Sequence, residues 1–152
     1  MAEPRIHPAA FVTKPPSSVA FLCVHNASRS QMAEGFAKRF APPDVLVMSA
    51  GSQPQPRGVH PMAITVMGEL GISLEGHHSK HVDDVPWQTA DTIVTLCDED
   101  AQVCPSNDPS VRRVHWALPD PSLVPESERL AAFRELREEI RWRVASLWPR
   151  GE

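Results

Sequence analysis

The chain has 152 residues, 41% of them hydrophobic and 22% charged, and a formal net charge of −4. This length suits one globular domain, and the modest negative charge gives no reason to expect binding to nucleic acid or a membrane. No apolar run approaches the roughly 20 residues of a membrane-spanning helix, and the first residues lack the apolar core of a secretion signal. We therefore expect a cytoplasmic protein in which any anion site is local.

The order of polar and apolar segments predicts one domain with an extension in front of it. Residues 1–18 are polar and rich in proline, which predicts a flexible extension before a single domain over residues 19–152. The apolar run 19–22 predicts a short buried strand, and residues 31–40 have the pattern of a helix. The sequence CVHNASRS, residues 23–30, therefore forms a loop from the carboxyl end of a strand to the start of a helix.

Cys23 and Arg29 bracket this loop, with five residues between them. Backbone N–H groups in such a loop converge on one point, and the helix dipole adds partial positive charge there. An arginine can bind two oxygens of an anion, and the same field lowers the pKa of a thiol. We predict that Cys23 is a nucleophilic thiolate, stabilised by the hydroxyl of Ser30, in an oxyanion cradle. The cradle consists of Cys23, Val24, His25, Asn26, Ala27, Ser28 and Arg29.

That spacing also occurs by chance, so the context of the loop matters. The alternative is a buried cysteine at a strand end beside a solvated arginine in the first turn of a helix. Strand, loop and helix in succession favour the cradle, which then requires a general acid elsewhere in the chain.

The rest of the chain continues the alternation of strands and helices. Strands are predicted at residues 45–50, 92–96 and 113–118, and helices from His60-Pro61 to about Leu70 and over residues 126–147. Such alternation predicts a three-layer α/β/α domain around a four-stranded parallel sheet. Ligands of these sheets bind beyond the carboxyl ends of strands, and Cys23, Cys97 and Asp120 each follow a predicted strand. We expect these three residues at one rim.

Residues 77–84 contain three histidines and two aspartates. Their spacing matches no common metal motif, so the segment predicts a polar loop and no metal site.

Asp120 stands between two prolines directly after the last predicted strand. When a thiolate attacks an oxyanion, an oxygen must leave, and a protonated carboxyl group at this rim can supply its proton. The alternative is an ordinary aspartate in a turn.

Cys97 and Cys104 have six residues between them, whereas common zinc motifs have two to four. In a regular helix their Cα atoms would lie about 10 Å apart, but a disulfide needs about 4.4–6.8 Å. A disulfide between them would therefore require the segment to unwind, as in a redox switch. A structural zinc site is the weaker alternative.

Five stretches of the chain together resemble the thioredoxin-coupled arsenate reductases, which share their fold with the low-molecular-weight protein tyrosine phosphatases. They span about residues 19–145, and the three-cysteine arrangement belongs to the reductase branch. The stretches are CVHNASRSQMAEG at 23–35, Ser49-Ala50-Gly51, His60-Pro61 with Ala63-Ile64, Thr95-Leu96-Cys97-Asp98 with Cys104-Pro105, and His115-Trp116 with Asp120-Pro121.

The resemblance implies a mechanism in three thiol steps. Cys23 attacks arsenate held by Arg29 and the loop, and Asp120 protonates the departing hydroxide. Cys97 then attacks Cys23, so that arsenite leaves and a Cys23–Cys97 disulfide forms. Cys104 attacks Cys97 in turn, and thioredoxin reduces the resulting Cys97–Cys104 disulfide.

The same resemblance implies the ligands and partners. Arsenate is the substrate, phosphate and sulfate compete with it, and thioredoxin is the electron donor. No bound cofactor is implied, and we expect a monomer. Asn26 would shape the cradle, and Ser30 would stabilise the Cys23 thiolate.

Two positions depart from the family pattern. Ser28 stands where many relatives carry another cysteine. Relatives that bind potassium use residues matching Asn26, Glu34 and Ser49, with an acidic residue where this chain has Lys80. We predict that the Lys80 ammonium group occupies the cation's place, so that the enzyme does not require potassium.

Two other functions remain open. A low-molecular-weight phosphatase would use Cys23, Arg29 and Asp120, but such enzymes place tyrosines near the acid, and this chain has no tyrosine. A non-enzymatic protein that binds oxyanions or senses oxidation is the second, and it predicts no catalytic turnover.

Overall fold

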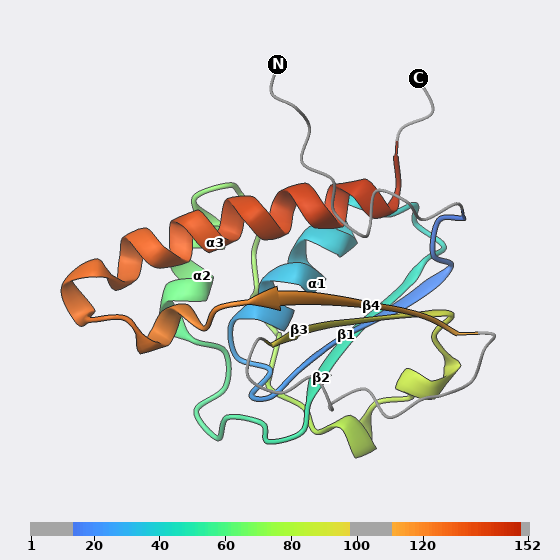
Figure 1. Cartoon of the computed structure of the whole chain (residues 1–152), viewed down its shortest axis with the longest axis horizontal. Helices are drawn as coiled ribbons and strands as arrows, with labels where there is room; N and C mark the ends of the chain where they lie inside the picture. Colours follow the sequence, from blue (N-terminus) through green and yellow to red (C-terminus); the bar gives the residue numbers. More distant parts are fainter. Residues whose placement is uncertain (1–13, 98–110, 150–152) are drawn as a thin grey trace.

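A computed structural model describes residues 14–97 and 111–149 of the protein. It confirms the four predicted strands and three predicted helices. The elements, in chain order, are β1 (Ser18–Cys23), α1 (Arg29–Phe40), β2 (Leu46–Gly51), α2 (Pro61–Gly68), β3 (Thr92–Cys97), β4 (Arg112–Leu118) and α3 (Glu126–Leu147) (Figure 1). Three short 3-10 helices add to them, η2 (Val82–Asp84), η3 (Trp87–Thr89) and η5 (Pro121–Leu123).

Two helix boundaries differ from the predictions. α1 begins at Arg29, two residues earlier than the apolar pattern indicated, because its first turn is polar yet buried. α2 ends at Gly68, although apolar spacing continues to Leu70. Residues 69–71 form turns in which Gly71 has a φ of +76°, and this left-handed conformation ends the helix.

The sheet is parallel, as predicted, and its strand order is β2-β1-β3-β4. From β1 the chain passes through α1 to β2 on one side, and it later returns to β3 on the other side of β1. The carboxyl end of β1 is therefore the point where the strand order reverses. In open α/β sheets this switch point is the usual place for a ligand, and Cys23 ends β1 there.

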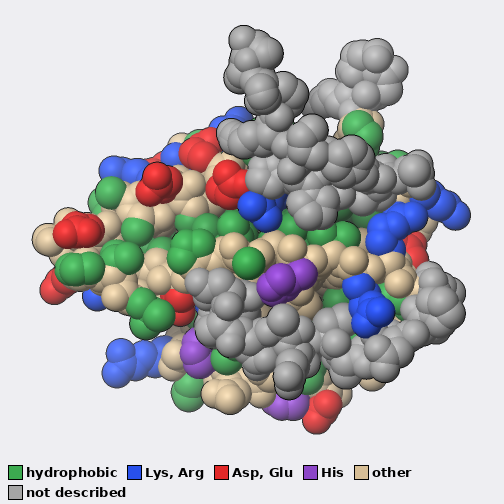
Figure 2. All heavy atoms as spheres, viewed as in Figure 1, with side chains coloured by type: hydrophobic (Ala, Val, Ile, Leu, Met, Phe, Trp, Pro, Cys, Tyr) green, Lys and Arg blue, Asp and Glu red, His purple; other side chains and the backbone are tan. Residues whose placement is uncertain are grey.

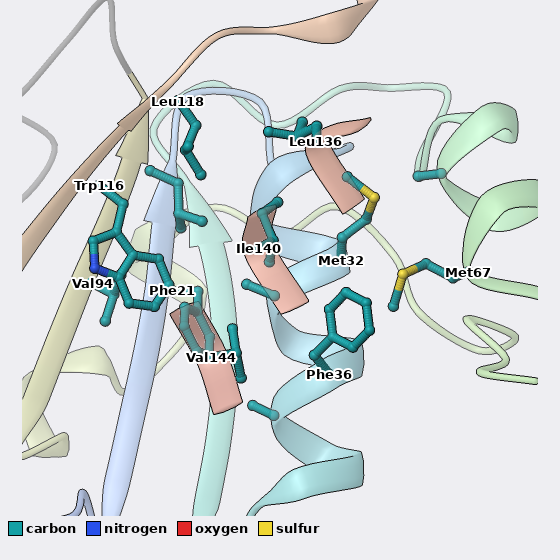
Figure 3. Packing of buried hydrophobic residues seen from close by; sticks show 14 of the residues in the cluster. Phe21, Met32, Phe36, Met67, Val94, Trp116, Leu118, Leu136, Ile140 and Val144 are labelled. Atoms are coloured by element: carbon teal, nitrogen blue, oxygen red, sulfur yellow. The ribbon is translucent and has the colours of Figure 1, made fainter. Parts of the chain in front are cut away.

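The three α-helices cover one face of the sheet (Figure 1). There the sheet side chains meet apolar side chains of α1, α2 and α3 in one core. Figure 3 shows this packing for Phe21, Val94 and Trp116 of the sheet, Met32 and Phe36 of α1, Met67 of α2, and Ile140 and Val144 of α3.

The opposite face of the sheet is covered by a different kind of structure. Ala20, Leu22 and Ile93 pack there against Val85 and Trp87, which belong to the segment containing η2 and η3. The predicted three layers are confirmed, and short 3-10 helices form the third.

Charged side chains of both signs lie over the outer face of α3 in Figure 2. Two of its arginines bind Glu69 at the end of α2, Arg134 Nη2 at 2.6 Å and Arg137 Nη1 at 2.7 Å. These hydrogen bonds lower the pKa of Glu69 to about 2. They join the two helices at the surface.

None of the helices within the described ranges is long and apolar enough to cross a membrane.

Candidate active site

The loop after β1 directs its carbonyl groups outward. The carbonyls of Cys23, Val24 and His25 accept hydrogen bonds from backbone N–H groups after β2, at 2.7–3.2 Å, and that of Ala27 accepts one from His60 N at 2.9 Å. Because the C=O and N–H of a trans peptide point in opposite directions, the N–H groups of residues 24, 25, 26 and 28 face inward, toward the centre of the loop. Inward N–H groups at a helix start can bind the oxygens of an anion, as the prediction of a cradle requires.

Two positions allow the loop to take this shape. Gly51 ends β2 directly beneath it, and a Cβ atom there would lie 2.5 Å from the carbonyl oxygen of Val24. Any side chain at this position would therefore push the loop away. Asn26 has a φ of +51°, a left-handed conformation that asparagine adopts at less cost than most residues.

Cys23 is buried at the base of the cradle, where polar groups of Ser30 and Asn26 contact its sulfur. Ser30 Oγ lies 3.1 Å from Sγ, and the backbone nitrogen of Asn26 lies 3.3 Å from it. Ser30 Oγ also accepts a hydrogen bond from Asn26 Nδ2 at 2.7 Å, which leaves the hydroxyl proton of Ser30 directed to Sγ. Both contacts stabilise negative charge on the sulfur.

Arg29 and Asp120 meet at the rim of the sheet. Arg29 Nη1 donates to the carbonyl oxygen of Leu118 at 2.9 Å, and Nη2 lies 3.5 Å from Asp120 Oδ2. The Arg29 side chain is only 3% exposed, so the alternative of a solvated arginine is wrong.

Ser122 holds the other oxygen of the Asp120 carboxyl group. Asp120 Oδ1 accepts hydrogen bonds from Ser122 N at 2.9 Å and Ser122 Oγ at 2.7 Å. Oδ2 is thereby turned toward Arg29. This role of Ser122 was not predicted, although an aspartate two residues before a serine is a recognisable turn signal.

The four residues predicted around the cation position lie together. Lys80 Nζ donates to the carbonyl oxygen of His78 at 2.8 Å and lies 3.4 Å from both Asn26 Oδ1 and Ser49 Oγ. Glu34 Oε1 is 4.0 Å from the same nitrogen and accepts a hydrogen bond from Ser49 Oγ at 2.6 Å. An ammonium group thus stands among oxygen atoms, next to the residues that contact the thiol.

Burial and charge act on this group in opposite directions. Burial disfavours the Glu34 carboxylate, but hydrogen bonds from Lys38 and Ser49 and the charges of Lys80 and Lys38 together hold the pKa of Glu34 below its usual value. Burial also lowers the pKa of Lys80, which the Glu34 charge partly offsets.

Gln31 and His77 complete this network and were not predicted. Gln31 is fully buried in α1, and its Nε2 donates to both the backbone and side-chain oxygens of Asn26 at 3.0 Å. Gln31 Oε1 accepts a hydrogen bond from His77 Nδ1 at 3.0 Å. The signal for Gln31 is its position in the first turn of α1, facing the loop that it supports.

A pocket of about 400 Å³ opens above the cradle. The predicted residues Cys23 and Arg29 reach it from the two ends of the loop after β1, and Asp120 reaches it from the turn after β4. His25, which was predicted as part of the cradle, also lines the wall of the pocket. Arg57 and His60 line it as well, and neither was predicted as a site residue.

Cys97 is the last residue of β3, and Cys104 lies outside the described residues. β1 and β3 are parallel neighbours in which Leu22 pairs with Thr95. The backbones of Cys23 and Cys97 therefore end adjacent strands at the same edge of the sheet.

Comparison with known families shows which family the chain belongs to. The profile of the low molecular weight phosphotyrosine protein phosphatase family matches residues 18–150. The chain belongs to this family. The cradle, arginine and aspartate described above all lie within the matched residues.

Curated members of the family that resemble this chain are named arsenate reductases. The protein from Halalkalibacterium halodurans is 38% identical over 136 residues, which cover 88% of this chain and 96% of that protein. The protein from Bacillus subtilis strain 168 is 40% identical over 124 residues, 80% of this chain and 88% of that protein. The resemblance inferred from the motifs is confirmed.

Solved structures agree with this assignment. An arsenate reductase in an oxidised state has a TM-score of 0.74 and 33% identity, covering 86% of this chain and 95% of its own. One in a phosphate-binding state has a TM-score of 0.67, 33% identity and coverage of 84% and 93%. A thioredoxin-dependent arsenate reductase from Corynebacterium glutamicum has a TM-score of 0.64 and 30% identity, and covers 86% of this chain and 61% of its own.

Proposed function

We propose that this enzyme reduces arsenate to arsenite and that thioredoxin supplies the electrons. The observation that carries the proposal is a buried cysteine sulfur inside a loop whose N–H groups face inward, beside Arg29 and Asp120. This arrangement suits a tetrahedral oxyanion, and the similar curated proteins are named for arsenate reduction. The expected location is the cytoplasm, where thiols are kept reduced.

In the first step the Cys23 thiolate attacks the arsenic atom of arsenate. The N–H groups of residues 24–29 and the Arg29 guanidinium bind the remaining oxygens. Asp120 gives its proton through Oδ2 to the departing oxygen, which leaves as water. Ser30 and Asn26 favour the thiolate by donating hydrogen bonds to the sulfur.

In the second step the Cys97 thiolate attacks Cys23 Sγ. A disulfide forms, and the electron pair of the sulfur–arsenic bond stays on arsenic, which leaves as arsenite. The adjacent strand ends of Cys23 and Cys97 support this pairing.

In the third step Cys104 attacks Cys97, which releases the Cys23 thiolate. Thioredoxin then reduces the Cys97–Cys104 disulfide by the same exchange. This step rests on the sequence, and the similarity to a protein named thioredoxin-dependent arsenate reductase supports the choice of donor.

Arsenite formation with thioredoxin, its reductase and NADPH tests the relay. We expect continued turnover for the wild-type protein and, for Cys104→Ser, no more than one arsenite per protein molecule. Repeated turnover by the variant with thioredoxin as the donor would contradict the three-cysteine relay. Absence of arsenite from the wild-type protein would contradict the function itself.

The second part of the proposal concerns Lys80, whose ammonium group takes the place of a potassium ion. Its position 2.8 Å from the carbonyl oxygen of His78, among the oxygens of Asn26, Ser49 and Glu34, supports this role. We expect no change in activity or Tm when tetramethylammonium replaces potassium. Lys80→Glu should acquire a potassium-dependent Tm. A clear potassium dependence of the wild-type protein would contradict the proposal.

The pocket volume favours a phosphomonoester as the alternative substrate. About 400 Å³ exceeds what a free oxyanion fills, since a water molecule occupies about 30 Å³ of liquid. Hydrolysis of p-nitrophenyl phosphate measures this activity. Turnover of this ester faster than turnover of arsenate would make the phosphatase the main function.

A further inference from the structure

The outer wall of the active-site pocket carries positive charge that the reduction of arsenate does not use. Arg57, in the loop between β2 and α2, lines the pocket and is exposed to solvent. Within residues 14–97 and 111–149, no carboxylate or carbonyl oxygen binds its guanidinium group. Arg29, in contrast, is buried and pairs with Asp120, the sole carboxylate among the described lining residues. The positive charge at the mouth is therefore left for a ligand.

A hydrogen-bond donor adds to this wall. His60 caps α2 through Nδ1, which accepts the N–H of Met62 at 3.0 Å, so that a neutral ring carries its proton on Nε2. Burial and the nearby Arg129 lower the pKa of His60 against the opposing charge of Asp120, which favours this neutral form. The ring also packs on Phe133, with 4.8 Å between the ring centroids. A fixed N–H donor thus lies on the same pocket as Arg57.

The size and composition of the pocket fit a ligand that is larger than a free oxyanion. Four oxygens at about 30 Å³ each occupy on the order of 100 Å³, whereas the pocket measures about 400 Å³. The described lining residues include no phenylalanine or tryptophan, so only the imidazole rings of His25 and His60 are there to contact an aryl group. Cationic and polar groups at a pocket mouth select a charged extension of the ligand.

We propose that the outer part of this pocket, which Arg57 lines, binds a second anionic group on the same small molecule whose tetrahedral oxyanion occupies the cradle. The ligand class is a small organic acid that carries a phosphonate, phosphate or arsonate group and, one or two carbon atoms away, a carboxylate. The inference rests on the proposed oxyanion cradle, and it extends the specificity of that site.

Calorimetric titration of the reduced protein with three probes at constant ionic strength tests this inference. The probes are inorganic phosphate, methylphosphonate and phosphonoacetate, and the last differs from the second by one carboxylate. An ion pair at 4 Å contributes about 1 kcal/mol in water, so we expect phosphonoacetate to bind about fivefold more tightly than methylphosphonate. Arg57→Gln should abolish this difference and leave the affinity for phosphate within about twofold.

Arg141→Gln is the matched control, because Arg141 pairs with Glu138 on the exposed face of α3 and does not line the pocket. It removes the same charge and should keep the fivefold preference. Equal binding of the two phosphonates by the wild-type protein, or a preference that survives in Arg57→Gln, would overturn the inference alone. Failure of phosphate itself to bind would overturn the cradle and the inference together.

Discussion

The loop between β1 and α1 has an inner side, which faces the protein interior, and an outer side, which faces the pocket. The two sides differ in how their polar groups are used. On the inner side, Gln31 Nε2 and the backbone N–H of Lys80 both donate to Asn26, through contacts that are buried or partly buried. Gln31 Nε2 and Lys80 Nζ also donate to the carbonyl oxygen of His78. On the outer side, Arg57 and Asp120 line an open pocket, and Arg57 is exposed.

This difference separates stability from chemistry. A buried polar group that loses its partner costs free energy of folding, so the inner side holds the loop in one conformation. On the outer side, Arg57 and Asp120 face the pocket, and Asp120 is held in place there by Ser122 and Arg29, so both groups can act on a ligand. Substitutions on the inner side should therefore change stability first, and those on the outer side should change catalysis or binding first.

The largest effect is expected for Asp120→Asn on the outer side. Asparagine keeps an oxygen that can accept the two hydrogen bonds from Ser122, but it cannot donate a proton as an acid does. General acid catalysis contributes about 10²–10⁴-fold, so the rate of arsenite formation should fall by that factor. The Tm should change little. A large loss of stability with an unchanged single-turnover rate would contradict the division between the two sides.

The next effect is expected for Gln31→Ala on the inner side. The substitution removes the donor to Asn26 and the acceptor for His77 from a fully buried position. Each group left without a partner costs about 1–3 kcal/mol, so the free energy of unfolding in urea should fall by about 2–4 kcal/mol. Gln88→Ala at an exposed position is the control and should change it by less than about 0.5 kcal/mol. Equal effects of the two substitutions would show that the inner network does not stabilise the loop.

The smallest effect is a dependence of stability on pH through Glu34. Its folded pKa lies below the unfolded value of 4.5, so the native carboxylate binds a proton less readily than the unfolded one. The resulting stabilisation is present above pH 4.5 and is lost as the pH falls through the folded pKa. Glu34→Gln should therefore flatten the decline in unfolding free energy below pH 4.5, measured with urea.

Glu135→Gln, on the exposed face of α3, is the control for this measurement. It should retain the wild-type decline. The same slope in Glu34→Gln as in the wild-type protein would show that the inner network is not coupled to acid unfolding.

Local patterns predicted most of the architecture. The apolar runs of β1, β3 and β4 are bounded by polar residues, and the apolar spacing of α3 extends from Glu126 to Leu147 as predicted. Boundaries shifted where another force outweighed hydrophobic spacing. α1 starts at Arg29 because its first turn packs under the loop, and α2 ends early at a turn with a left-handed Gly71.

The sequence by itself determined the strand, the loop with Cys23 and Arg29, and the acid after β4, because these depend on neighbouring residues. The family resemblance grouped Lys80 with Asn26, Glu34 and Ser49, but only the tertiary structure showed how these residues make contact and placed Gln31, His77 and Arg57 beside the loop. The backbone N–H of Gly51 donates to the carbonyl of Lys80 at 2.8 Å, and Gly51 forms a parallel bridge with His81. This pairing places Lys80 beside Asn26 although 54 residues separate them in the chain. Long-range backbone pairing has no local pattern, so neither the inner network nor the position of Arg57 at the pocket follows from periodicity or spacing.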